Sequence, residues 1–327
     1  MKERGMMPRQ PRFIQMSLGG KIFLCVLAIV YLGYLVAFAN FLHPSASGPS
    51  IAEHLMNTNF DITFKHWTPA SMLNAIDPNQ QDNNVSDFTQ ASTYTTSNTV
   101  AQQQGLSGES SDPLSIVGKV FFTNSAGQDM VCSGTAIVSS NHSVVDTAGH
   151  CLYWNNNWVQ KVIFCPLYDN GSTPYGCWAA RDLEVPSDWI NRKPNDLHHD
   201  FGMAIVAPTS QGKLTDIVGG AGWTYNQPAD QAFYAYGYPA GHPFDGQTRQ
   251  SCENRSGTLW KLAGGIVVSI PCDMTGGSSG GPWFIQINGN LYLDGHNDFT
   301  STIKPGHMFS PYYDDTWYAL YQKAQYT

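Results

Sequence analysis

Short runs rich in β-branched and aromatic residues fill the chain from about residue 116, and they restrict the possible fold more than any other feature. Gly, Pro, Asn or Asp separate the runs, which is typical of strands joined by turns. The sequence therefore predicts an all-β fold for this region. The runs are Val117–Thr123, Thr135–Ser139, Ser143–Asp146, Trp158–Cys165, Phe201–Ala207, Ala232–Tyr238, Gly265–Pro271, Trp283–Ile287 and Asn290–Leu293.

Only the C-terminal end departs from this pattern. Within residues 315–324, the spacing of Trp317, Leu320 and Tyr321 places these apolar side chains on one face of a helix. We therefore expect a C-terminal helix after the strands.

Length and composition allow a substantial core in one or two domains. The chain has 327 residues, of which 42% are hydrophobic and 13% are charged. Its net charge is −8 and it has no basic patch, so we expect no nucleic-acid partner.

The N-terminus has the order of an export signal, with basic residues before an uncharged apolar run at Ile22–Leu42. Ala37-Phe38-Ala39 offers a signal-peptidase site, so we expect residues 1–42 to be removed and the protein to be secreted. The run is also long enough to span a membrane. The alternative is an uncleaved leader that anchors the protein to the outer face of the cytoplasmic membrane, its only expected membrane contact. The basic residues are Lys2, Arg4, Arg9, Arg12 and Lys21.

Residues 43–115 are predicted to be a pro-region or flexible linker. Ile51–Ile76 has enough apolar content for a short helix or strand, whereas Asp77–Pro113 is dominated by Asn, Gln, Ser and Thr. The few apolar residues of this second part cannot offset the entropy lost on ordering it. We expect a pro-region that is removed on maturation; the alternative is a spacer between the membrane and the folded domain.

Six cysteines follow this region, and an even number in an exported protein favours disulfides. No C-x-x-C or H-E-x-x-H pattern occurs, so we predict neither a metal site nor a cofactor. The sequence leaves the connectivity open, but joining near neighbours pairs Cys132 with Cys151, Cys165 with Cys177, and Cys252 with Cys272.

The glycine-dense stretch Asp273–Pro282 contains the candidate nucleophile, Ser279. Glycines allow backbone amides to approach a substrate carbonyl closely, although flexible loops have similar sequences. A serine hydroxyl needs an imidazole base and a carboxylate that orients it. His150 follows a predicted strand and precedes a cysteine, and Asp200 lies at the start of a buried strand. These residues are the candidate base and carboxylate.

Together, Thr147-Ala-Gly-His150-Cys151, Asp200 before an apolar strand, and Gly277-Ser-Ser279-Gly-Gly-Pro282 follow the order His, Asp, Ser. Over residues 116–327 the chain thereby resembles the trypsin-like (chymotrypsin-fold) serine peptidases, and especially the bacterial secreted branch with the V8-type glutamyl endopeptidases. The resemblance implies two antiparallel β-barrels, at about 116–212 and 213–313, with the cleft between them and the C-terminal helix against the second barrel.

The resemblance also implies roles for single residues. His150 is the general base, Asp200 orients it, Ser279 is the nucleophile, and the N–H groups of Gly277 and Ser279 form the oxyanion hole. The implied function is that of a secreted, monomeric serine endopeptidase that acts on protein or peptide substrates through an acyl-enzyme. The alternative is a non-catalytic secreted or surface binding module that retains the fold.

Four residues compete for these roles. Ser278 is a second candidate nucleophile, but Gly-Gly-Pro follows Ser279 directly, as the family requires. His198 and His199 are alternative bases that lack the context of His150, and Asp196 lies four residues before Asp200 in an expected loop.

The chain departs from trypsin at Ser278, where trypsin has the aspartate that binds the new N-terminus on activation. Removal of a pro-region must therefore act by another route, such as unmasking the cleft. The substrate preference stays open. Asp273 lies six residues before Ser279, where trypsin has its specificity aspartate, and this resemblance implies a basic P1 side chain. His296 lies in a stretch resembling the one that binds an acidic P1 side chain in glutamyl endopeptidases, and the third alternative is no preference at all.

Overall fold

The computed structural model describes residues 48–57, 59–77, 89–90, 114–191, 197–262 and 265–327. The predicted export signal and nearly all of the Asn/Gln/Ser/Thr-rich stretch lie outside these residues. The fold is that of the unit Pro49–Thr327. No helix within the described ranges is long and apolar enough to cross a membrane.

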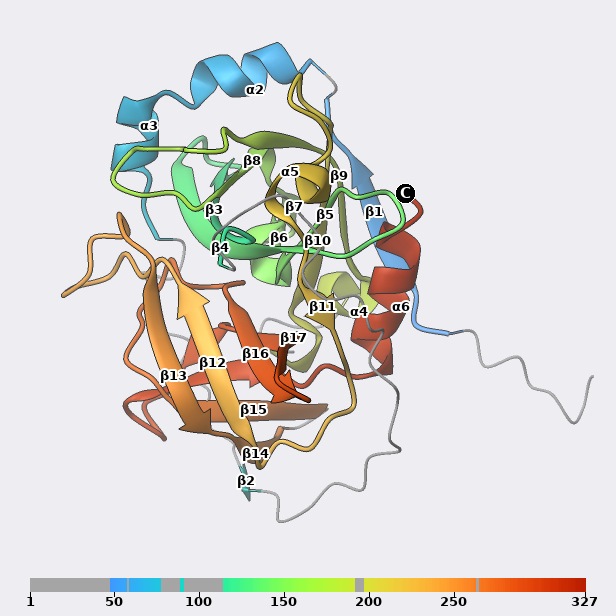
Figure 1. The fold of residues 1–327 in the computed structure, drawn as a ribbon, viewed down its shortest axis with the longest axis vertical. Coiled ribbons are helices and arrows are strands. Elements are labelled where there is room, and N and C mark those ends of the chain that lie inside the picture. The colour runs from blue at the N-terminus through green and yellow to red at the C-terminus, as the bar shows by residue number, and fades with distance from the viewer. Residues whose placement is uncertain (1–47, 58, 78–88, 91–113, 192–196, 263–264) are drawn as a thin grey trace, which may run out of the picture. The chain divides into compact units, whose positions relative to one another are not determined.

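A closed six-stranded antiparallel barrel forms the first half of the fold (Figure 1). The strands follow the order β9-β10-β5-β4-β3-β8, and the pairing of β8 with β9 closes the barrel. Every residue of β3, β5 and β10 is buried, including Lys119 of β3 and Asp146 of β5. The bounds are β3 Val117–Thr123, β4 Asp129–Ile137, β5 Val144–Ala148, β8 Gln160–Pro166, β9 Trp178–Pro186 and β10 Phe201–Val206.

Two five-stranded sheets form the second half, in the orders β11-β17-β16-β12-β13 and β18-β19-β15-β14-β2. They share a core to which Phe233, Ile270 and Trp283 contribute. All neighbours are antiparallel except β11 and β17. The bounds are β2 Thr89–Gln90, β11 Gly222–Trp223, β12 Ala232–Gly237, β13 Gln250–Ser256, β14 Thr258–Leu262, β15 Gly265–Pro271, β16 Pro282–Ile287, β17 Asn290–His296, β18 Phe299–Thr300 and β19 His307–Pro311.

The C-terminal helix α6 spans Asp315–Ala324, as predicted, but its expected position was wrong. It packs against β10, β9 and β1 of the first half rather than mainly on the second, as Figure 1 shows. Trp317 and Leu320 are buried there, and Trp317 Nε1 donates a hydrogen bond to Asp146 Oδ1 at 2.8 Å. The buried carboxylate of β5 thus supplies the partner that the indole needs, and it holds the helix on the first barrel.

Part of the segment before residue 78 belongs to this fold (Figure 1). Strand β1 (Ile51–Leu55) pairs antiparallel with β9, and helices α2 (Phe60–His66) and α3 (Pro69–Asn74) follow. Trp67, at the end of α2, is buried and donates to the main-chain oxygen of Lys161. The structure therefore places both helix and strand within 51–76.

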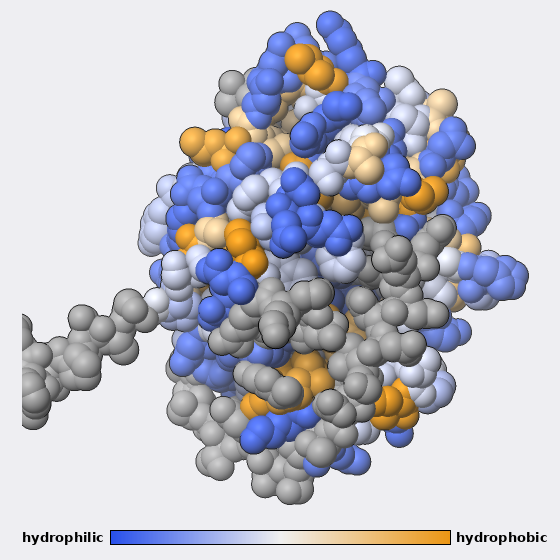
Figure 2. Space-filling view, turned by 180° about the vertical axis from the view of Figure 1, so that it is seen from behind, coloured by the Kyte–Doolittle hydropathy of each residue, from blue (hydrophilic) through white to orange (hydrophobic). Residues whose placement is uncertain are grey.

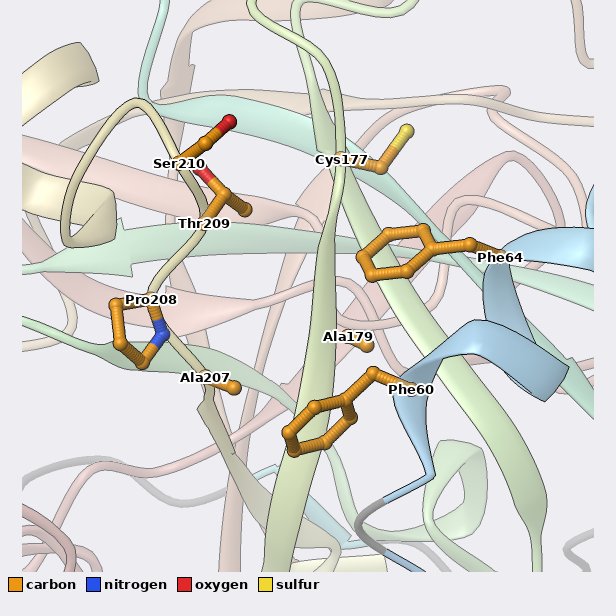
Figure 3. A pocket seen from close by; sticks show the side chains of 8 residues that line it. All are labelled: Phe60, Phe64, Cys177, Ala179, Ala207, Pro208, Thr209 and Ser210. Carbon is orange, nitrogen blue, oxygen red and sulfur yellow. The ribbon is translucent and has the colours of Figure 1, made fainter.

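Helix α2 also covers a pocket on the first barrel (Figure 3). The rings of Phe60 and Phe64 lie over Ala179 of β9. None of the candidate catalytic residues lines this pocket. The lining residues are Phe60, Phe64, Cys177, Ala179, Ala207, Pro208, Thr209 and Ser210.

The face of the molecule opposite to that in Figure 1 is mostly hydrophilic, with scattered apolar residues among its described atoms (Figure 2). Large apolar side chains that are exposed occur mainly before residue 78, including Leu55, Ile62 and Leu73. The described surface from residue 114 onward has few of them.

Candidate active site

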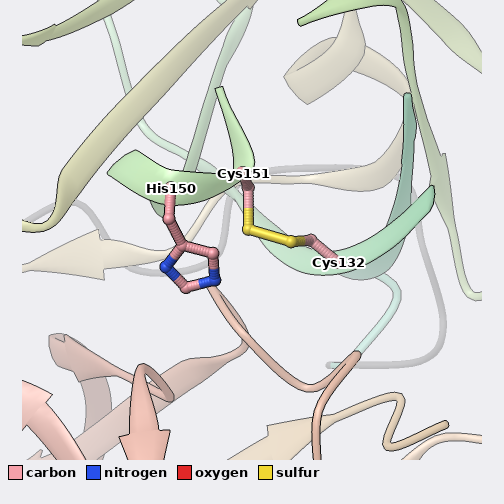
Figure 4. A group of neighbouring side chains, drawn as sticks. All are labelled: Cys132, His150 and Cys151. Carbon is pink, nitrogen blue, oxygen red and sulfur yellow. A yellow bond between two sulfur atoms is a disulfide. The ribbon is translucent and has the colours of Figure 1, made fainter. Parts of the chain in front are cut away.

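His150 lies where β5 ends and a short 3₁₀ turn, Gly149–Cys151, begins. The disulfide between Cys132 of β4 and Cys151 ties this turn to the neighbouring strand, with His150 beside it (Figure 4). His150 is only 3% exposed. The disulfide and the strand end therefore fix the backbone from which the imidazole projects.

All three disulfides have the connectivity predicted from near neighbours. Besides Cys132–Cys151, the structure has Cys165–Cys177 between β8 and the start of β9, and Cys252–Cys272 between β13 and the end of β15. The last of these links the two sheets of the second half.

Asp200 lies between a 3₁₀ turn (Leu197–His199) and β10, and it holds His150 through two contacts. Its Oδ2 lies 2.8 Å from His150 Nδ1, and its Oδ1 accepts the His150 main-chain N–H at 2.7 Å. A carboxylate in this place keeps the proton on Nδ1, so that in neutral histidine Nε2 is the ring nitrogen that can accept a proton. The structure thus brings together the predicted base and its predicted carboxylate.

Ser279 lies in a loop that is pressed against the first barrel. Its main-chain oxygen accepts a hydrogen bond from the Ser133 N–H at 2.7 Å. Gly280 has φ +78°, and a Cβ there would lie 2.1 Å from Thr147 Oγ1. Glycine is therefore needed for both the left-handed backbone and the close approach to β5.

The side chain of Ser279 is buried and donates a hydrogen bond to the main-chain oxygen of Asp298 at 3.4 Å. His150 Nε2 makes no hydrogen bond within the part of the chain that the structure describes. The structure therefore shows no hydrogen bond between the Ser279 hydroxyl and His150. Such contacts often form only when substrate binds.

Gly277 has the geometry expected of an oxyanion-hole residue. Its φ is +91°, and its carbonyl is turned toward Ser133, whose hydroxyl donates to it at 3.0 Å. Among the described residues, no main-chain oxygen accepts a hydrogen bond from the Gly277 N–H. Ser278, by contrast, donates both its N–H and its hydroxyl to the Thr275 oxygen, which makes it a turn residue.

The buried charges strongly perturb the His150–Asp200 pair. Burial disfavours the imidazolium, but the charge and hydrogen bond of Asp200, helped by Asp298, outweigh burial and raise the pKa of His150 to about 10. Burial favours neutral Asp200, but the charge of His150 and hydrogen bonds from His150 and Asp298 outweigh it and lower the pKa of Asp200. The surroundings of the pair therefore favour an imidazolium beside a carboxylate, the charge state that forms when His150 takes up a proton.

Asp298 is the residue of this site that sequence reasoning missed. Its Oδ1 lies 3.5 Å from His150 Nδ1. Burial, together with the charge of Asp200, raises the pKa of Asp298 well above its ordinary value. The one signal in the sequence was an acidic residue two positions after the end of β17, which does not reveal its tertiary neighbours.

The two candidate substrate-pocket residues occupy different environments. His296 is fully buried, with Nδ1 2.9 Å from the Tyr313 hydroxyl and Nε2 3.1 Å from the Asp200 main-chain oxygen. Both ring nitrogens are thus engaged by protein groups. Asp273 is exposed. The substrate preference therefore stays a prediction.

Two further groups of side chains have ligand atoms close enough for a metal ion. In the first, Cys132 and Cys151 are joined in a disulfide, so their sulfurs are not thiolate ligands. In the second, Glu53, Asp182 and Glu184, the Lys323 ammonium already lies against Glu53 and 3.4 Å from Glu184. The group of His150, Asp200 and Asp298 is held by the direct contact at 2.8 Å between the first two. In each of these groups, two of the three residues that could bind a metal ion are already engaged with another protein group.

The chain is similar to known proteases in sequence and in structure. No protein-family model matches it. It is 25% identical over 130 residues to the extracellular metalloprotease of Bacillus subtilis (strain 168), a match that spans 39% of this chain and only 36% of that protein.

Two solved structures share more of the fold. The thermostable serine protease AL20 from an extremophilic microorganism is 38% identical, with 65% of this chain and 98% of that one covered at a TM-score of 0.59. The protease Anisep from Arthrobacter nicotinovorans is 34% identical, with 65% and 97% covered at a TM-score of 0.59.

Proposed function

The chain belongs to the serine proteases of the chymotrypsin-like fold, and on that premise we propose that it is a secreted serine endopeptidase whose nucleophile is Ser279. The observation that carries the proposal is the contact of 2.8 Å between His150 Nδ1 and Asp200 Oδ2, with both side chains buried. This contact is what a general base needs in order to be oriented and to become positively charged during the reaction.

The proposed reaction is acyl transfer through a covalent intermediate. Ser279 Oγ attacks the scissile carbonyl while His150 Nε2 takes its proton, and Asp200 stabilises the imidazolium. The N–H groups of Gly277 and Ser279 stabilise the oxyanion. His150 then gives its proton to the leaving amine, and water, activated by His150 in the same way, releases the acyl group and regenerates Ser279.

Secretion is supported by the cysteines. Three disulfides among six cysteines are expected in an oxidising compartment rather than in a cytosol. We therefore propose an extracellular protease that acts on protein or peptide substrates as a monomer, with residues 1–42 as its export signal.

We also propose that residues 43–115 are a pro-region that masks the site until it is removed. Ile76 pairs with β4, since its N–H donates to the Asp129 oxygen at 3.0 Å and its oxygen accepts from the Val131 N–H at 2.9 Å. Asp77 is 8% exposed, and a Cβ on Gly276 would lie only 1.7 Å from its Oδ2. The Asp77 side chain thus lies against the residue that precedes the proposed oxyanion-hole residue Gly277.

Hydrolysis of a general protein substrate tests the proposed activity. We expect the secreted protein to hydrolyse denatured casein, and the Ser279→Ala variant to lose nearly all of this activity. The matched variant Ser140→Ala changes a serine outside the proposed site and should retain it. Equal activity of the wild type and Ser279→Ala would reject the assignment, and no activity in the processed protein would favour a non-catalytic binding module.

Masking is tested in the unprocessed chain. Asp77→Ala should raise the rate at which a fluorophosphonate modifies the protein before maturation, while Asp61→Ala, in α2, should not. Faster reaction of the unprocessed than of the mature protein would contradict masking.

A further inference from the structure

A second buried carboxyl lies beside the His150–Asp200 pair, and no step of the proposed reaction uses it. Asp298 is 3% exposed, and its Oδ1 is 3.5 Å from His150 Nδ1. Ligand atoms of His150, Asp200 and Asp298 all lie within 4.8 Å of one another. Neither carboxylate oxygen of Asp298 has a hydrogen-bond donor among the described residues. A buried polar group in this position needs a partner.

We infer that Asp298 is a positioning residue of the proposed catalytic site, whose side chain holds Asp200 in place and whose main-chain oxygen holds the Ser279 hydroxyl. The inference rests on the proposed function, because it assigns a role within that site. Asp298 acts through its neighbours and does not itself react with substrate.

The charges around Asp298 show in which form it acts. The titratable groups that face it are Asp200 and His150. Two ionised carboxylates this close in a buried site repel each other, so one of them keeps a proton. Asp200 is the ionised one because His150 stabilises its charge, and the raised pKa of Asp298 makes Asp298 the neutral one.

A neutral carboxyl has the donor that a carboxylate lacks. Ligand atoms of Asp298 and Asp200 lie within 4.8 Å of each other, so the O–H of a neutral Asp298 can donate a hydrogen bond to Asp200, and such a bond lowers the pKa of Asp200. Both oxygens of Asp200 already accept a hydrogen bond from His150, and each has a further lone pair. Asp200 is therefore held from one side by His150 and from the other by Asp298.

The main chain of Asp298 is fixed independently of its side chain. Its N–H donates to the Phe309 oxygen of β19 at 2.9 Å, and its oxygen accepts the Ser279 hydroxyl at 3.4 Å. One residue thus contacts the proposed nucleophile through its backbone and the base–carboxylate pair through its side chain.

Two substitutions separate the neutral donor from a charged carboxylate. Asp298→Asn keeps an N–H donor without a charge, and Asp298→Ala removes the donor. The readout is the second-order rate constant for modification by a fluorophosphonate. It is measured on the processed protein between pH 5 and 11. We expect Asp298→Asn to react close to the wild-type rate with the same pH midpoint. Asp298→Ala should react about tenfold to a hundredfold more slowly, the loss expected for a hydrogen bond to a charged group.

Two results would overturn the inference. A wild-type rate in Asp298→Ala would show that the side chain positions nothing. A midpoint in Asp298→Asn that is lower by about one pH unit or more would show that Asp298 acts as a charge on His150. If Asp298→Ala does not fold, the pH dependence of the modification rate of Asp298→Asn still decides whether Asp298 is neutral or charged.

Controls separate this inference from the proposed function. Asp314→Ala changes a partly buried carboxyl that caps α6, and it should lower stability without changing the rate or the midpoint. If Ser279→Ala is modified as fast as the wild type, the proposed function fails. If modification needs Ser279 but Asp298→Ala reacts normally, only the role of Asp298 fails.

Discussion

Asp200 accepts two hydrogen bonds from His150, one from its main-chain N–H at 2.7 Å and one from Nδ1 at 2.8 Å. The first fixes the carboxylate relative to the turn that carries His150, and the second fixes the ring. Because both residues are buried, solvent does not screen this pair. The two contacts therefore hold the carboxylate and the imidazole in one relative orientation.

Replacing Asp200 by Asn should nearly abolish catalysis. The amide can leave the proton on the wrong ring nitrogen, and in proteases of this type such a change lowers kcat by about 10⁴-fold. Casein hydrolysis and thermal unfolding of Asp200→Asn should show lost activity with a folded protein. Activity within about tenfold of the wild type would contradict the role of Asp200.

The activity should rise with pH well beyond neutrality. Only neutral His150 can accept the proton of Ser279, and the neutral fraction grows as the pH rises through a pKa that Asp200 above all holds at about 10. The rate of fluorophosphonate modification should therefore have its midpoint above the ordinary histidine value of about 6.5. A midpoint at or below that value would show that the carboxylates do not stabilise the imidazolium.

Gly280→Ala should destabilise the protein and impair the site. Both Gly280 and Gly289 have positive φ, but a Cβ on Gly289 meets nothing within 4 Å, whereas one on Gly280 would lie 2.1 Å from Thr147 Oγ1. Gly289→Ala should cost about 1–2 kcal/mol from its backbone conformation alone. Denaturant unfolding should show a larger loss for Gly280→Ala, and equal losses would mean that the loop does not press against β5.

The C-terminal helix should contribute strongly to stability. Leu320 is fully buried in the core of the first half, so Leu320→Ala should lower the free energy of unfolding by about 2–5 kcal/mol. Ile303→Ala, at a side chain that is 45% exposed, should change it by no more than about 0.5 kcal/mol. Similar values for the two variants would contradict the packing of α6.

The all-β class, the C-terminal helix and the candidates His150, Asp200 and Ser279 were accessible from the sequence. Strand patterns are local, and each candidate lies at a strand end or in a glycine-rich turn, where short motifs indicate position. The sequence left the disulfide connectivity open, although joining neighbouring cysteines gave the pairs that the structure has.

Other features depend on contacts between distant segments. The apolar face of α6 predicted that the helix is buried. Which barrel it packs against depends on tertiary contacts, such as the hydrogen bond of Trp317 to the buried Asp146. The placement of Asp298 beside His150 depends on how β17 meets the first barrel. The contact of Asp77 with Gly276 joins residues nearly two hundred positions apart. No local pattern carries this information.

Mapping the site of covalent modification tests the central claim most directly. The processed protein would be treated with a fluorophosphonate, digested and analysed by mass spectrometry. We predict a single phosphonylated residue, Ser279, which forms more slowly at a pH where His150 is protonated than at a pH above the raised pKa of His150. An adduct on Ser278 or on another serine, or no adduct on the processed wild-type protein, would contradict the assignment of Ser279 as the nucleophile.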